Sequence, residues 1–112
     1  MLYTTLKLLS EEEVKGLRER LLNSPGWISG KNTATGTAKT VKNNLQLSRT
    51  KEKLKFSEEI NNYLFTNPSV NDTIFPRKLV GSLFARTAAG MNYGPHLDDP
   101  TAIEGRRDIS FT

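Results

Sequence analysis

The chain has 112 residues, 36% of them hydrophobic and 25% charged, with a net charge of +4. This length suits one domain that buries about 65% of its unfolded surface, and the composition is typical of globular proteins rather than disordered ones. The absence of cysteine excludes disulfides and thiolate chemistry, and no apolar stretch has the length of a signal peptide or a membrane span. We therefore expect a single soluble domain, residues 1–112, in the cytoplasm.

The first helix is predicted from its capping signals. Residues 3–8 are expected to form a strand, after which Ser10 is placed as an N-cap and Glu13 as its capping-box partner. Apolar residues then recur at i, i+3 and i+7, which favours one buried helix face ending near residue 22. These residues are Val14, Leu17 and Leu21.

The middle of the chain predicts a loop and a second helix. Residues 27–28 are expected to begin a strand, 30–40 to form a loop, and 41–48 show no clear periodicity. A helix is predicted over 51–65, and the dipeptide at 67–68 ends it. Its buried stripe has the spacing 0, 4, 7, 8. The stripe consists of Phe56, Ile60, Tyr63 and Leu64.

The character of the sequence changes at residue 76, beyond which strands are predicted. The expected order is a strand at 79–86, a loop at 87–95, a strand start at 96–98, a loop at 99–105 and a last strand at 107–112. The fold class is therefore α+β, with a helical support region over 1–75 and a β region over 76–112.

The segment YGPHLDDP contains the only histidine of the chain. In an extended strand His96 and Asp98 project from the same face. An imidazole nitrogen and a carboxylate oxygen are two of the three ligands in the 2-His-1-carboxylate site of non-haem Fe(II) enzymes. Taken alone, however, a histidine two residues from an aspartate is more often an ordinary hydrogen-bonded pair.

Four segments together favour the metal interpretation. The segments AKTVKNNLQLS, FPRKLVGSLFAR, YGPHLD and RRDISFT cover much of residues 38–112. In this order and at this spacing, the chain resembles the PKHD-type hydroxylases, relatives of the prolyl 4-hydroxylases among the Fe(II)- and 2-oxoglutarate-dependent dioxygenases. The resemblance spans essentially the whole chain.

The resemblance implies an N-terminal helical support for a double-stranded β-helix, or jelly roll. It implies Fe(II) as cofactor and 2-oxoglutarate as co-substrate, leaves ascorbate open as a further cofactor, and implies hydroxylation of a peptide or a small molecule. By position, His96 and Asp98 are the expected iron ligands. Further residues are expected near the co-substrate or the substrate. These are Thr87 and Tyr93 for the co-substrate, and Asn43 and Asn44 for the substrate. The structural alternatives are an aromatic ring at the edge of the core for Tyr93, and a polar loop whose amides bond the local backbone for Asn43 and Asn44.

Two departures from the family pattern shape these expectations. Thr87 stands where the family has a tyrosine, and the chain has no second histidine that could complete the triad. A jelly roll also needs about eight strands. We therefore expect the N-terminal half of a dioxygenase, poorly active alone, and whether this chain is an enzyme by itself stays open.

A non-enzymatic role is the alternative. The basic surplus could serve a binding module for nucleic acid or an acidic protein, but Lys and Arg alternate with Glu over 49–59, which favours a solvated helix face instead. Nucleic acid and membrane are therefore not expected partners. Pairing of identical chains through unfinished sheet edges is a further alternative.

Overall fold

The computed structural model describes residues 5–34, 36–48, 51–79, 81–96, 101–102, 105–107 and 109. The chain forms two compact units. The first unit comprises Met1–Trp27 with Leu47–Phe84, and the second comprises Ile28–Gln46 with Ala85–Thr112. Each unit is therefore built from segments far apart in the sequence.

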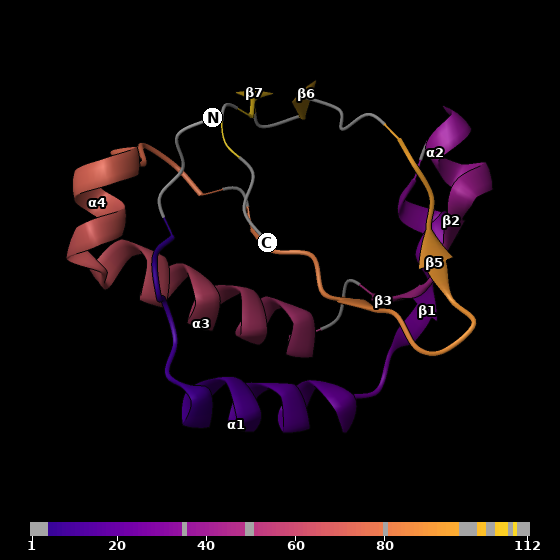
Figure 1. Ribbon diagram of the computed structural model, residues 1–112, viewed down its shortest axis with the longest axis horizontal. Helices are drawn as coiled ribbons and strands as arrows, with labels where there is room; N and C mark the ends of the chain where they lie inside the picture. The colour runs from indigo at the N-terminus through magenta and orange to yellow at the C-terminus, as the bar shows by residue number, and fades with distance from the viewer. Residues whose placement is uncertain are drawn as a thin grey trace. The chain divides into compact units, whose positions relative to one another are not determined.

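Helices make up most of the first unit. They are α1 (Glu11–Leu22), α3 (Lys51–Thr66) and α4 (Pro68–Ile74), and α1 and α3 lie side by side in Figure 1. The predicted capping box starts α1, since Glu13 N donates to Ser10 Oγ at 3.1 Å and Ser10 N donates to Glu13 Oε1 at 3.0 Å. Hydrogen bonds from Tyr63 and then from Ser10 hold the pKa of the Glu13 carboxyl below its ordinary value.

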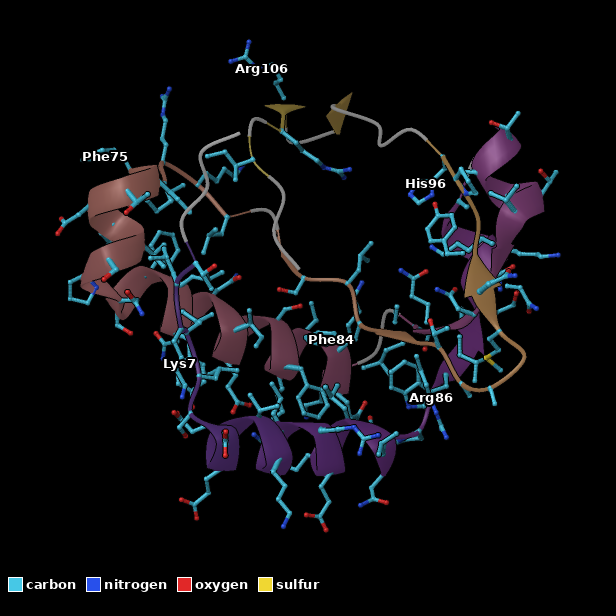
Figure 2. All side chains as sticks on the ribbon, in the orientation of Figure 1. Lys7, Phe75, Phe84, Arg86, His96 and Arg106 are labelled. Atoms are coloured by element: carbon cyan, nitrogen blue, oxygen red, sulfur yellow. The ribbon has the colours of Figure 1, made fainter. Side chains whose placement is uncertain are left out.

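The core of the first unit lies between α1 and α3. Its buried members are Leu17, Leu47 and Phe56, and the partly buried residues packed on them are Leu9, Leu21, Trp27, Ile60 and Phe84. Phe84 meets Phe56 edge to face at 5.9 Å between ring centroids, and Figure 2 shows Phe84 beside the helices. The Trp27 indole N–H donates to the Leu21 carbonyl at 3.1 Å. This supplies a hydrogen bond to one of the last carbonyls of α1, which have no partner within the helix. Val14, predicted in this stripe, is instead 47% exposed.

A charged pair joins the outer surfaces of α1 and α3. Both guanidinium nitrogens of Arg20 donate to the Glu59 carboxylate, at 2.8 and 2.6 Å. The Arg20 guanidinium lowers the pKa of Glu59, and Glu59 in turn raises the pKa of Arg20. The bidentate geometry favours the side-by-side packing of the two helices, although solvent screens a pair this exposed.

Short antiparallel strands form three small sheets. The first sheet has the order β1 (Trp27–Ser29), β3 (Leu45–Leu47), β4 (Ala85–Arg86). The second pairs β2 (Lys42–Asn43) with β5 (Asn92–Tyr93), and the third pairs β6 (Thr101–Ala102) with β7 (Gly105–Arg106). Between β1 and β2 the chain forms a 3-10 helix, η1 (Gly30–Thr33), and a short helix, α2 (Gly36–Val41).

Several local predictions for the first half of the chain were wrong. Residues 5–8, predicted as part of a strand, have no strand partner in the sheets that the structure describes. The predicted loop at 30–40 contains η1 and α2. The glycines of this segment favoured a loop in the sequence, but its alanine and threonine residues also allow a helical turn. After α3, the dipeptide at 67–68 starts another helix rather than only ending one, with Asn67 as N-cap and Pro68 in the first turn.

The predicted strands also differ in extent. Among the described residues of the strand predicted at 79–86, which exclude residue 80, only Ala85–Arg86 is β structure, since Gly81 has φ 112° and interrupts an extended run. The predicted loops at 87–95 and 99–105 contain β5 and β6. Residues 107 and 109 are not in a strand, and the predicted strand start at 96–98 lies outside the described residues beyond His96.

The mixed helix and sheet class is confirmed, whereas the jelly roll is not. The sheets of the described residues are small and antiparallel, and no closed barrel forms among them. The division of the domain at residue 76 stays a prediction. In the part of the chain that the structure describes, no helix has the length and apolarity to span a bilayer.

The Arg20–Glu59 pair predicts a specific pH dependence of stability. Because the folded-state pKa of Glu59 lies below its ordinary value of 4.5, the pair stabilises the fold above that pH and loses this effect as the pH falls through the lowered pKa. Glu59→Gln should lower the free energy of unfolding by about 0.5 kcal/mol at neutral pH. Thermal melts should show the difference vanishing in acid. Glu58→Gln is the matched control, and an E59Q deficit that persists well below pH 4.5 would contradict the assignment.

Candidate functional site

Two motifs that are far apart in the sequence pair as neighbouring strands. In β2 and β5, Lys42 faces Tyr93 and Asn43 faces Asn92 (Figure 1). The pairing continues one residue further, where Gly94 N donates to the Val41 carbonyl at 2.9 Å. A Cβ on Gly94 would lie 3.0 Å from Val41 Cβ, so glycine permits this close approach. The VKNN and NYGPH segments therefore form one local structure.

Contacts with Tyr93 and with the Gly94 carbonyl help to hold His96 at this structure. Its ring stacks on Tyr93, with 3.7 Å between centroids and 4° between planes. Its Nδ1 lies 2.8 Å from the Gly94 carbonyl oxygen. A carbonyl only accepts, so Nδ1 carries the proton in this hydrogen bond, and in the neutral imidazole the lone pair is then on Nε2. Figure 2 shows the labelled His96 beside the segment that follows β5.

This arrangement suits a metal ligand. Histidines that bind metals usually donate their second ring N–H to a carbonyl or carboxylate, as His96 does to Gly94. Asp98, the other predicted ligand, lies outside the described residues, so its geometry relative to His96 stays a prediction. Among the side chains that the structure does describe, no three potential metal ligands gather.

Lys42 is an unusual buried cation in the same unit. It is 6% exposed, and its Nζ donates to Gln46 Oε1 at 3.3 Å and lies 4.9 Å from the centroid of the Tyr93 ring. Burial lowers the pKa of the Lys42 ammonium. Lysine is rarely buried in proteins unless it is paired, and here Gln46 and the Tyr93 ring are its partners.

Asn44 forms the second buried polar group of this segment. Its side chain is 7% exposed, and its backbone carbonyl accepts a hydrogen bond from Gly30 N at 2.8 Å. The Asn44 Oδ1 atom is buried and has no hydrogen-bond partner among the residues that the structure describes. A Cβ on Gly30 would overlap this oxygen and approach Lys42 Cε to 3.0 Å. Gly30 is therefore needed for the segment to pack.

The predicted site residues differ in their exposure and in whether they contact one another. Tyr93 and His96 are brought together. Asn43 is exposed and its amide donates to the Gly90 carbonyl at 3.5 Å, while Asn44 is buried. Thr87 directly follows β4 and has an exposed side chain. The predicted contacts of these five residues with ligands are not tested by the structure and stay predictions.

Gln46 is the member of the site that sequence reasoning missed. It is 2% exposed and shares the inward side of its segment with Lys42 and Asn44. The spacing i, i+2, i+4 places residues on one face of an extended chain. The alternate positions carry Val41, Leu45 and Leu47, so the sequence pattern favoured the opposite face as the buried one and gave no signal for a buried polar row.

Comparison with known proteins gives consistent relatives. No family model matches the chain, and no solved structure matches it. A PKHD-type hydroxylase of Prochlorococcus marinus strain AS9601 is 40% identical over the whole chain, which covers 52% of that relative. Strain MIT 9515 has a PKHD-type hydroxylase with the same identity and coverage, and that of strain MIT 9211 is 38% identical over 95% of the chain and 49% of its own length. The chain thus spans about half the length of the curated relatives it matches.

Gly30 offers a direct test of the buried polar row. Gly30→Ala should lower the free energy of unfolding by about 1–3 kcal/mol, because the new methyl overlaps the Asn44 side chain. Gly16→Ala, within α1, has open space around its Cβ and should instead stabilise the chain by about 0.5–1 kcal/mol. Urea denaturation measures both changes. Equal effects of the two substitutions would contradict the described packing.

The buried Lys42 ammonium predicts a stability change in alkali. Since its folded-state pKa lies below the ordinary value of 10.5, the unfolded chain binds more protons between these two pKa values, and stability rises with pH there. The free energy of unfolding of the wild type should therefore increase relative to that of Lys42→Met as the pH approaches 10.5. Denaturation at several pH values measures this, with Lys15→Met as control for loss of one charge. A constant difference would show that Lys42 is not desolvated.

Proposed function

Because the chain is related over its whole length to the PKHD-type hydroxylases, we propose that it is the part of an Fe(II)- and 2-oxoglutarate-dependent hydroxylase that carries the first two iron ligands. The relatives support the hydroxylase class, and their printed names go no further. The observation that carries the iron proposal is the His96 imidazole, which is oriented by the Gly94 carbonyl as metal-binding histidines are.

His96 Nε2 and the Asp98 carboxylate would hold the metal. When bound, Fe(II) supplies the activation of dioxygen for hydroxylation of a C–H bond, with 2-oxoglutarate as the co-substrate. The part that His96 itself plays is to present a neutral nitrogen, with its proton held on Nδ1 by the Gly94 carbonyl. Asp98 adds the negative charge that favours a divalent cation.

The remaining functions require residues outside these 112. The chain contains one histidine, so a 2-His-1-carboxylate site needs its third ligand from elsewhere, together with a base for the far carboxylate of 2-oxoglutarate. The relatives are about twice as long as the matched region, so such residues have room there. We propose that the 112 residues alone bind the metal weakly and turn over little 2-oxoglutarate.

Asn43 is the better placed of the two predicted substrate contacts. Its side chain is exposed beside β5, whereas that of Asn44 is buried against Gly30. We assign Asn43 to the substrate, with its amide as donor and acceptor, and assign Asn44 to the packing that supports β2.

Metal titration of the purified chain tests this function. Fe(II), added without oxygen and followed by calorimetry, should bind to the wild type, and His96→Ala or Asp98→Ala should weaken the affinity at least about tenfold, since a two-ligand site loses half its donors. Asp72→Ala, an exposed carboxylate on α4, is the matched control and should bind like the wild type. Affinity that survives both ligand substitutions would exclude the proposed half-site.

A fusion tests the chemistry. The 112 residues joined to the remaining half of the AS9601 relative should convert 2-oxoglutarate to succinate, and the same fusion carrying His96→Ala should not. Robust succinate formation by the 112 residues alone would refute the need for a third ligand.

A further inference from the structure

We propose that Tyr93 and Lys42 are positioning residues for His96, and that they set the direction of its imidazole ring before any metal binds. The inference rests on the proposed function only for the identity of His96 as a ligand. Its structural basis is a continuous series of contacts, from Gln46 through Lys42 and Tyr93 to His96.

The first restraint acts on the face of the imidazole. At 3.7 Å between centroids and 4° between planes, the Tyr93 and His96 rings are in van der Waals contact over their faces. The His96 ring cannot turn about its Cβ–Cγ bond without losing this contact. The stack therefore selects the plane in which the two ring nitrogens lie.

The second restraint acts on one edge of the ring. The Gly94 carbonyl accepts from Nδ1 at 2.8 Å, which distinguishes this nitrogen from Nε2. Gly94 is itself held, because its N–H donates to the Val41 carbonyl at 2.9 Å and its Cα lies against the Val41 side chain. The plane and the edge together leave one direction for the Nε2 lone pair.

Lys42 places Tyr93. The two residues are cross-strand partners in β2 and β5, so the backbone ladder sets their spacing. The Lys42 ammonium lies 4.9 Å from the centroid of the Tyr93 ring, within the range of a cation–π contact. Gln46 Oε1 accepts from the same ammonium at 3.3 Å. Because Lys42 is buried and bonded, it can hold the ring in one place.

This arrangement matters most for a site with few ligands. A histidine that samples several orientations in the free protein loses that freedom on binding metal, which weakens the affinity. Outer residues that orient metal-bound histidines are commonly worth 10–100-fold in metal affinity. The structure assigns that task to Tyr93, three residues before His96, and to Lys42, which the strand pairing brings beside Tyr93 from about fifty residues away.

The single histidine makes the test direct. In the ¹⁵N-labelled chain at mildly alkaline pH, the two imidazole nitrogens of His96 give the only histidine signals, which report the tautomer without any metal. The wild type should show one dominant tautomer protonated on Nδ1. Tyr93→Leu should shift the spectrum toward averaged tautomers and weaken Fe(II) binding by about tenfold or more.

Two further variants separate positioning from a general loss of structure. Tyr93→Phe keeps the stacked ring and should retain both the tautomer and the affinity of the wild type. Lys42→Met should weaken Fe(II) binding by about two- to fivefold, the worth of a modest cation–π contact. Circular dichroism of every variant verifies that the helices remain.

The outcomes distinguish this inference from the proposed function. If Tyr93→Leu leaves both the tautomer signals and the Fe(II) affinity unchanged, Tyr93 does not position His96, whatever the chain binds. If Tyr93→Phe changes the tautomer signals and the Fe(II) affinity as much as Tyr93→Leu in a folded chain, the ring stack does not orient His96 and the inference fails. If the tautomer changes as expected but the wild type binds no Fe(II), the positioning stands and the metal proposal falls.

Discussion

The pairing of β2 with β5 is the interaction on which the candidate site depends. Two residue pairs and one further hydrogen bond, from Gly94 to Val41, join segments separated by about fifty residues of sequence. Every contact of His96 described above starts from this ladder, because Tyr93 lies in β5 and Gly94 follows it. A ladder this short stabilises little by itself, so side-chain contacts across it have to contribute.

Those side-chain contacts are polar, which is costly in a buried segment. Lys42, Asn44 and Gln46 are each under a tenth exposed, and burial of a polar group is unfavourable unless it is bonded. Lys42 and Gln46 meet each other, while Asn44 Oδ1 lacks a partner among the described residues. The first unit, in contrast, has an ordinary apolar core around Leu47 and Phe56.

The proposed function rests on the relatives and on the geometry of His96. All three relatives described above are PKHD-type hydroxylases matched over about half their length. The hydrogen bond from His96 Nδ1 to the Gly94 carbonyl is the observation behind the proposed metal ligand, and it does not depend on the relatives. The one histidine in 112 residues then limits what these residues do without further ligands.

Local signals in the sequence predicted the two long helices, α1 and α3. The capping box of Ser10 and the stripe through Phe56 and Leu64 each predicted an element correctly, because helix formation depends on residues within a few positions of one another. The α4 helix and β5 were missed, because a helix of 7 residues and a strand of 2 residues carry too few side chains to show a period. The metal interpretation of His96 and Asp98 came from four segments considered together, because the two residues alone favoured an ordinary hydrogen-bonded pair, and it stays a prediction. Only the tertiary structure placed Lys42 over Tyr93 and Tyr93 against His96, since cross-strand partners are chosen by long-range pairing that no local pattern records.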